Sequence, residues 1–243
     1  MNLPLYKYDG AELELFSNAR NWKNYSISKI VPHVKGDVLE IGAGIGSNTE
    51  VFLKATSIRE KVKSWTCLEP DKAMADFIDN LIRAEKLPGI TRVINGTIYD
   101  IEESKTYDSI IYIDVLEHIT EDKKEIAIAT RRLKKNGELI VLSPAHQWLF
   151  SPFDKAVGHH QRYSRKSLSS LKHADVDLVS MRYLDSAGIF LSLGNRIILQ
   201  RNMPTIRQIK FWDGYIIPVS RVLDKIHRYS IGKSILAIWR RNT

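Results

Sequence analysis

The sequence lacks the features of a disulfide-stabilised or membrane-spanning protein. It has a single cysteine, Cys67, which excludes an internal disulfide framework and a metal site with several cysteine ligands. Cys67 lies in the apolar stretch 64–68, so we interpret it as a small buried hydrophobe. No apolar run approaches the roughly 20 residues that cross a membrane, and residues 1–10 carry charge and proline where a signal peptide has an apolar core. We therefore expect a cytoplasmic protein.

Low-complexity tracts and internal repeats are absent as well, so we do not expect a disordered chain. The content of hydrophobic residues (44%) and of charged residues (26%) is ordinary for a folded domain. A length of 243 residues suits one large α/β domain with an elaborated cap. We predict a single domain over 1–243, with an N-terminal helical cover over 1–35 and a helical cap over 187–229.

Positive charge is concentrated near the C-terminus. The chain has a formal net charge of +8, and ten Lys and Arg against two Asp between positions 196 and 241 account for all of it. Any anionic partner should therefore meet this part of the chain. Apolar residues recur at helical spacing within 187–229. Two interpretations stay open: a helical cover over an anionic substrate, or a surface helix in peripheral contact with an anionic membrane.

Short runs rich in Val and Ile alternate with helical patterns, which is typical of a parallel sheet with crossover helices. The runs are continuously apolar, as expected when both faces of a sheet are covered. We predict strands at Asp37–Ala43, Trp65–Glu69, Arg92–Asn95, Ser109–Asp114, Glu138–Ser143, Leu178–Leu184 and Ile235–Trp239. We predict helices at Phe16–Tyr25, Ser47–Ala55, Lys72–Ala84, Glu121–Leu133 and Arg165–Lys172, the last capped by Ser164. Residues 145–163 are predicted to form a long functional loop.

A glycine-rich turn joins the first predicted strand to the first predicted helix. In Glu40-Ile41-Gly42-Ala43-Gly44-Ile45-Gly46, glycines let the backbone turn sharply and approach a ligand. At the carboxyl edge of a parallel sheet this is where nucleotide-like ligands bind. Glu69, at the end of the second strand, can accept hydrogen bonds from both hydroxyls of a ribose.

The spacing of these glycines discriminates between two cofactors. A dinucleotide site has G-x-G-x-x-G, but here the spacing is G-x-G-x-G and Ser47 occupies the sixth position. Glu40 would repel a pyrophosphate, whereas it is favourable near the ammonium group of a methionine moiety. The pattern therefore favours S-adenosylmethionine (SAM).

Three segments together resemble the class I SAM-dependent methyltransferases, closest to the ubiquinone, type-11 and type-12 small-molecule branch. They are Leu39–Gly46, Leu68–Asp71 and Tyr112–Ile119. Residues 144–154 and 158–164 are similar to uncharacterised bacterial members. The resemblance implies a Rossmann-like, doubly wound, mostly parallel seven-stranded α/β sheet, with a helical insertion before the last strand.

The resemblance also implies roles for individual residues. Asp114 would lie beside the methionine end of SAM, and Thr97 and Ile98 beside the adenine ring. The family often has Asp where Thr97 stands, so backbone amides are expected to serve the adenine here. Asp71 would lie near the adenine edge or cap the next helix. The predicted cofactor-binding residues are Glu40, Gly42, Gly44, Gly46, Glu69, Pro70, Thr97, Ile98 and Asp114.

The loop after the fifth strand is predicted to form the acceptor side of the pocket. A hydroxyl acceptor needs a base with a pKa near neutrality, and His159, followed by His146, are the predicted catalytic residues. The predicted acceptor-binding residues are Trp148, Phe153, Arg162 and Tyr163. The spacing of the histidines with Asp154 matches no compact zinc pattern, so no metal ligand is predicted.

We expect methyl transfer from SAM to a small-molecule, sugar or lipid-linked acceptor, with O-methylation preferred to N- or C-methylation. A nucleic-acid methyltransferase is a second hypothesis, suggested by the sequence pI of about 9.4. The segment Asp114-Val115-Leu116-Glu117 opposes it, because it is not an Asn/Asp-Pro-Pro-Tyr adenine-amino site. A non-catalytic SAM-binding protein is the third.

Overall fold

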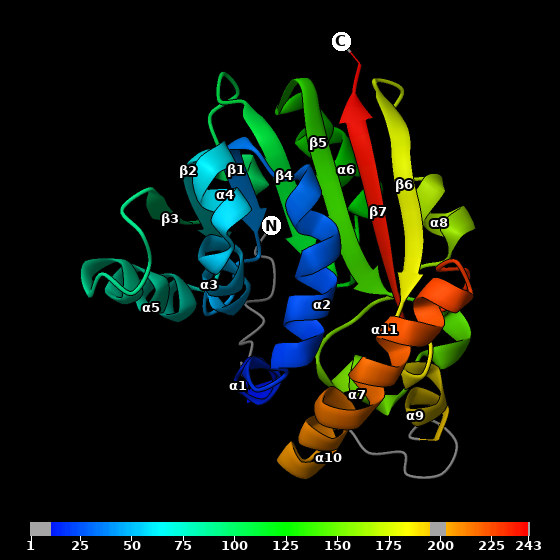
Figure 1. Ribbon diagram of the computed structural model, residues 1–243. Coiled ribbons are helices and arrows are strands. Elements are labelled where there is room, and N and C mark those ends of the chain that lie inside the picture. The colour runs from blue at the N-terminus through cyan, green and yellow to red at the C-terminus, as the bar shows by residue number, and fades with distance from the viewer. Residues whose placement is uncertain (1–10, 195–202, 243) are drawn as a thin grey trace.

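Seven strands form one mixed sheet in the computed structural model, which describes residues 11–194 and 203–242 (Figure 1). The spatial order is β3-β2-β1-β4-β5-β7-β6, and β7 alone is antiparallel to its neighbours β5 and β6. The strands are β1 (Gly36–Ile41), β2 (Val62–Glu69), β3 (Thr91–Asn95), β4 (Tyr107–Ile113), β5 (Leu133–Pro144), β6 (Val176–Leu184) and β7 (Ser234–Arg241). The predicted fold class is confirmed, including the helical insertion before the last strand.

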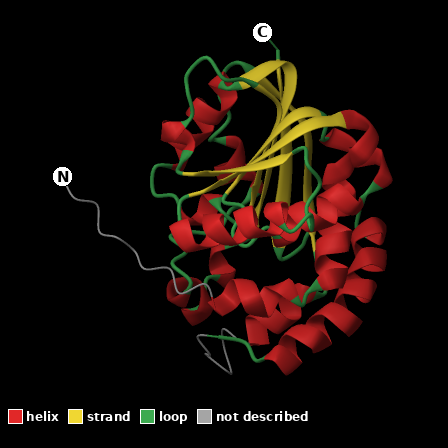
Figure 2. Cartoon of the chain, turned by 90° about the vertical axis from the view of Figure 1, so that its left-hand side faces the viewer, coloured by secondary structure: helices red, strands yellow, loops and turns green. Residues whose placement is uncertain are grey.

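Helices cover both faces of the sheet (Figures 1 and 2). Successive strand residues point to opposite faces, so Val38 belongs to one apolar core and Leu39 to the other. The same alternation separates Ile111 from Ile110 on β4. The α-helices are α1 (Ala11–Ser17), α2 (Arg20–Ile30), α3 (Ser47–Lys54), α4 (Thr56–Lys61), α5 (Lys72–Arg83), α6 (Asp122–Arg131), α7 (Pro152–Ala156), α8 (Arg165–Ser169), α9 (Gly188–Gly194), α10 (Ile206–Phe211) and α11 (Ile217–Ile226). The described residues also form short helical turns: η1 (Val31–His33), η2 (Ile98–Asp100), η3 (Leu116–His118), η4 (Gln147–Leu149) and the π-helical η6 (Trp212–Ile216).

Two buried aspartates of the insertion between β6 and β7 form hydrogen bonds with α2. Asp213 accepts hydrogen bonds from the backbone N–H groups of Asn21 (3.0 Å) and Trp22 (2.8 Å), which caps the positive end of α2. Asp224 accepts a hydrogen bond from the hydroxyl of Tyr25 (2.6 Å). The helices at the start of the chain and those of the insertion therefore meet over the carboxyl edge of the sheet, at the bottom of Figure 1.

The segment predicted as a loop over 145–163 is partly helical. It contains η4 and α7, and α7 begins with a capping box in which the Ser151 side chain and the Asp154 carboxylate satisfy each other's backbone N–H groups. Pro152 at the first helical position suits this start, because its missing N–H is not needed there. In the described residues, no helix is both long and apolar enough to cross a membrane.

Candidate functional site

The glycine-rich turn after β1 has a backbone conformation and close contacts that disfavour residues with side chains. Gly42 and Gly44 both have positive φ (65° and 58°). A Cβ on Gly42 would lie 2.5 Å from a methyl carbon of Val115, and a Cβ on Gly44 would lie 3.2 Å from Leu13. Glycine is required here both by conformation and by space. The glycines let the turn pack closely against Val115 and Leu13, and we call this turn the glycine cradle.

Glu69 closes this cradle from the end of β2. Its carboxylate accepts hydrogen bonds from the N–H of Gly44 (2.7 Å) and from the N–H of Asp71 (3.0 Å). Burial raises the pKa of Glu69, while the two backbone hydrogen bonds oppose that rise. Asp71 caps α5 by accepting a hydrogen bond from the N–H of Met74 (3.0 Å). The carboxylate of Glu69 is thus fixed in place next to the glycine turn.

Glu40 lies beneath the same turn, buried in the sheet. One of its oxygens accepts hydrogen bonds from the hydroxyl of Thr49 (2.6 Å) and from the indole N–H of Trp65 (2.8 Å). Burial raises the pKa of Glu40 to about 7, although both hydrogen bonds act in the opposite direction. The predicted role of Glu40 toward a cofactor ammonium stays a prediction.

The predicted adenine side follows β3. Thr97 caps η2, and its backbone N–H and hydroxyl both donate to the carboxylate of Asp100 (2.7 and 2.8 Å). Ile98 is 1% exposed, and Pro70 lies exposed after Glu69. Because the hydroxyl of Thr97 is engaged, backbone groups remain the expected partners of an adenine ring, as the sequence indicated.

Asp114 directly follows β4 and has a left-handed backbone (φ 53°). The Asp114 side chain is exposed to the cavity on one side, and its enclosure by protein on the other sides raises the pKa of Asp114 to about 6. The nearby positive charges of His159, Lys233 and Lys23 limit the rise. An acid in this state can attract a cationic group such as an ammonium.

The cavity has a volume of about 510 Å³, within the range of small-molecule sites. Leu13 lines the cavity and also lies beside Gly44, so it lies between the cavity and the glycine turn. Of the predicted cofactor-binding residues, Asp114 alone belongs to the lining of this cavity. Polar groups of the floor include Asp114, Glu117 and His159. Aromatic and aliphatic residues of the N-terminal helices and of the insertion form much of its remaining wall: Leu13, Phe16, Trp22, Ile209, Phe211 and Trp212.

His159 lies in this cavity with its orientation fixed by Asp154. The Nδ1 atom of His159 is 2.8 Å from a carboxylate oxygen of Asp154. The guanidinium of Arg162 donates two hydrogen bonds to the same carboxylate (2.8 and 2.9 Å), and Ser151 donates two more. Burial alone would raise the pKa of Asp154, but the hydrogen bonds from His159 and Arg162 bring it well below its usual range. Asp154 therefore accepts the Nδ1 proton and leaves Nε2 of His159 as the basic nitrogen.

The structure separates the other predicted acceptor-side residues. Phe153 and Arg162 line the cavity, whereas Trp148, Tyr163 and the second predicted catalytic residue, His146, lie outside its lining. The left-handed backbone of His146 (φ 66°) places its ring against Tyr183, with ring centres 4.8 Å apart. The Tyr163 hydroxyl donates to Asp122 (2.8 Å) and is buried. These side chains hold the loop in place and do not reach the cavity.

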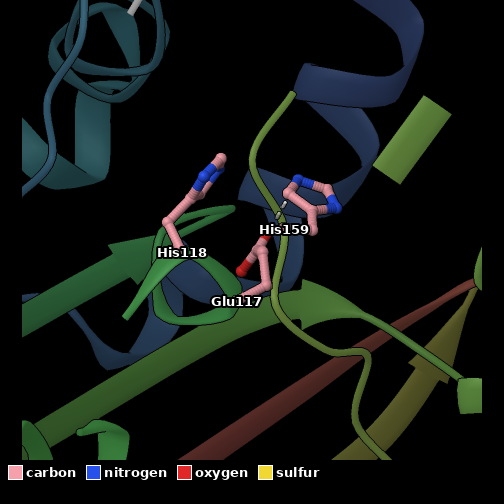
Figure 3. A group of neighbouring side chains, drawn as sticks. All are labelled: Glu117, His118 and His159. Carbon is pink, nitrogen blue, oxygen red and sulfur yellow. Dashed lines mark ion pairs between the residues drawn. The ribbon is translucent and has the colours of Figure 1, made fainter. Parts of the chain in front are cut away.

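Glu117 and His118, which end the segment Tyr112–Ile119 and could from the sequence either cap the next helix or serve the site, both line the cavity. The carboxylate of Glu117 is fully buried and makes no hydrogen bond within the described structure. One of its oxygens lies 3.8 Å from Nε2 of His159, the approach marked in Figure 3. Burial and then the charge of Asp114 raise the pKa of Glu117 well above its usual value. Ligand atoms of Glu117, His118 and His159 lie within 4.8 Å of one another, so these side chains could together hold a metal ion.

Sequence comparison agrees with this geometry. The profile of a family described as "Methyltransferase domain" matches residues 39–139, which include the glycine turn, Glu69 and Asp114. An uncharacterized methyltransferase of Bacillus cereus is 30% identical over 107 residues, which cover 43% of this chain and 45% of that protein. The chain thus matches less than half the length of this relative.

Structural comparison extends the likeness to nearly the whole chain. Coclaurine N-methyltransferase, solved with N-methylheliamine and SAH, superposes with a TM-score of 0.60 at 16% identity, covering 90% of this chain and 71% of that one. The [4+2]-cyclase SpnF superposes with a TM-score of 0.61 at 13% identity, covering 96% and 95%. The fold is that of the class I methyltransferases. Residues 39–139, less than half of the chain, match the methyltransferase-domain profile, and SAM is the cofactor of the class I methyltransferases.

Proposed function

We propose that the protein transfers the methyl group of SAM to a hydroxyl of a small-molecule, sugar or lipid-linked acceptor. The observation that carries this proposal is His159, which lines the cavity and whose Nδ1 lies 2.8 Å from the buried carboxylate of Asp154. An imidazole whose Nδ1 is held by a carboxylate is a common form of general base. O-methylation needs such a base, because a hydroxyl is a poor nucleophile while it keeps its proton.

The described residues fit the cofactor. The glycine cradle has no room for side chains at Gly42, and Glu69 presents a fixed carboxylate for the ribose hydroxyls. Asp114, at the cavity wall, would attract the ammonium group of the methionine part. When bound, SAM supplies an electrophilic methyl on a positively charged sulfur, and the electron pair of the broken carbon–sulfur bond stays with that sulfur.

The residues of the chain then need to orient the acceptor and to take its proton. As the acceptor oxygen bonds to the methyl carbon, its proton passes to Nε2 of His159, and Asp154 stabilises the imidazolium that forms. Phe16, Trp22 and Trp212 give the cavity an aromatic wall, which reduces the contact of the reactants with water. Close positioning of the two reactants provides a large part of the rate.

The two other hypotheses lack such an observation. A largely apolar cavity of about 510 Å³ favours a small or slender acceptor over a folded nucleic acid. A non-catalytic SAM-binding role leaves the pairing of His159 with Asp154 without a purpose. SpnF shows that this fold also occurs in a protein named as a cyclase, so the reaction has to be tested directly.

Transfer of tritiated methyl from SAM to cell extracts tests the proposal. Extracts separated into lipids, RNA and small metabolites each receive the full chain and the labelled cofactor. We expect label in the lipid or the metabolite fraction, and we expect the labelled product to be stable to conditions that cleave methyl esters. Label in RNA alone would establish the nucleic-acid hypothesis instead. Binding of SAM with no label in any fraction would favour the non-catalytic one.

A further inference from the structure

The helical insertion presents an apolar stripe to solvent. Five large apolar residues recur at intervals of four, four, three and four along α10, η6 and α11, which places them on one side of the helical segment. We call them the docking face. They are Phe211 (51% exposed), Tyr215 (69%), Val219 (49%), Val222 (60%) and Ile226 (66%). A soluble helix ordinarily keeps such a stripe for its core.

The core of this segment is on its opposite side, so the docking face is not needed for folding. Trp212, Ile217 and Ser220 are buried there, and Asp213 and Asp224 make the hydrogen bonds that fix α2 and Tyr25. Both acids of Ile206–Ile226 are therefore turned inward and engaged. One side of the helical segment packs on the protein, while the docking face on the other side is exposed to solvent.

The charges beside the docking face all have one sign. In Ile206–Ile226 the exposed charged residues are Arg207, Lys210, Arg221 and Lys225. An apolar stripe flanked by cations is the arrangement with which an interfacial helix enters the boundary of an anionic bilayer. A second copy of this chain would bring equal positive charges together, which opposes self-association through the same face.

The docking face also borders the cavity. Phe211 belongs to both, and Arg207, Ile209 and Trp212 of the same helical segment line the cavity wall. The segment lies at the carboxyl edge of the sheet, where α10 and α11 are drawn in orange in Figure 1. An amphiphilic acceptor anchored in a bilayer could therefore present its polar end to His159 without leaving the membrane.

We propose that the docking face binds the surface of an anionic lipid bilayer, and that the acceptor is a lipid-linked molecule supplied from that bilayer. The choice of acceptor rests on the proposed methyl transfer, whereas binding to the bilayer does not. The two can therefore fail separately. Vesicle binding is measured without SAM or acceptor, and methyl transfer is measured on extracted lipid in detergent.

Sedimentation with vesicles tests the membrane contact. The full chain is mixed with vesicles of phosphatidylcholine and phosphatidylglycerol, or of phosphatidylcholine alone. We expect binding to the mixed vesicles that weakens at high salt, and at least about tenfold weaker binding to the neutral ones. The double variant Val222→Asp/Ile226→Asp should reduce binding about tenfold or more. Lys210→Glu/Lys225→Glu should reduce binding to the anionic vesicles only.

A matched control is Leu178→Asp on β6, where an apolar side chain with 48% exposure is replaced in the same way far from the insertion. It should change vesicle binding by less than about twofold. Light scattering of the parent and of the double variant tests the alternative that a second copy of this chain covers the docking face. The proposal would be overturned if the parent did not bind anionic vesicles, or if Leu178→Asp lost as much vesicle binding as the double variant. It would also be overturned if the parent were a dimer and the double variant a monomer.

Discussion

Replacing His159 by alanine removes the imidazole that lies between Asp154 and Glu117 in the cavity. Nδ1 of His159 contacts one oxygen of Asp154, and that oxygen keeps a hydrogen bond from Arg162 (2.8 Å) after the change. The other oxygen keeps its bonds from Arg162 and Ser151. The fold therefore loses about one hydrogen bond to a charged group, roughly 1.5–3 kcal/mol, and should persist.

The rate should fall far more than the stability. Loss of a general base lowers kcat by about 10²–10⁴, which is about 2.7–5.5 kcal/mol in the barrier. The glycine turn and Glu69 do not contact His159, so the affinity for SAM should hold above about pH 7. Nearer pH 6 it should fall somewhat, because the charge of His159 no longer opposes the rise in the pKa of Asp114. The assay is kcat with saturating acceptor over the range about pH 6–9, where an imidazole titrates.

The neighbouring histidine provides the control. His160 is exposed, and only its backbone N–H bonds to the carbonyl of Glu117 (2.8 Å), so His160→Ala keeps that contact. It should retain kcat within about twofold. A near-normal kcat for His159→Ala at every pH, with SAM affinity intact, would refute the role of His159 as the base.

Three further outcomes follow from the charges of the site. Because the pKa of Asp114 is raised to about 6 by its enclosure, SAM affinity should be level above about pH 7 and weaken below pH 6 by up to about tenfold per unit. For Asp114→Asn, titration calorimetry should show weaker SAM binding that no longer changes with pH near 6. If the change near pH 6 persisted in this variant, another group would be responsible for it. The folded-state pKa of Glu40 lies at about 7, above its ordinary 4.5, so its contribution to stability is full below about pH 4.5 and is lost as the pH rises through 7. Glu40→Gln keeps an oxygen that can accept the hydrogen bonds of Thr49 and Trp65. It should remove this pH dependence of the free energy of unfolding, which is on the order of 3 kcal/mol and is measured by denaturant unfolding between pH 5 and pH 8. If parent and variant lost stability equally with pH, the assignment to Glu40 would be contradicted. Treatment with EDTA should leave kcat unchanged, because Asp154 already orients His159 and proton transfer needs no cation; a loss that Mg²⁺ or Zn²⁺ restores would instead make Glu117, His118 and His159 a metal site.

The parts of the fold that the sequence predicted are those governed by local pattern. The apolar runs and the glycine spacing specify the strands and the turn after β1 because both depend on residues adjacent in the chain. For Asp71 the sequence left two roles open, near the adenine edge or capping the next helix, and the structure shows that it caps α5. The helix α7 was missed although Ser151-Pro152-Phe153-Asp154 carries its own capping signal.

The acceptor side depends on contacts between distant segments, which the sequence pattern does not contain. The place of His159 in the cavity depends on the loop after β5 folding back on η3, where the N–H of His160 donates to the carbonyl of Glu117 (2.8 Å). Lys233 reaches the cavity only because β7 begins at the carboxyl edge after the insertion. His146 was the second predicted catalytic residue after His159, but its ring stacks on Tyr183 and lies outside the lining of the cavity.

Titration calorimetry of the full chain with SAM is the most direct test of the central claim, which is that the glycine turn and Glu69 form a SAM site. We predict binding at one site and no comparable binding of NAD. Glu69→Ala should weaken SAM binding by about 1.5–3 kcal/mol, the cost of hydrogen bonds lost from a charged group, because its carboxylate is fixed by Gly44 and Asp71 beside the turn. Absence of SAM binding to the intact chain, or tight binding of NAD in its place, would contradict the account.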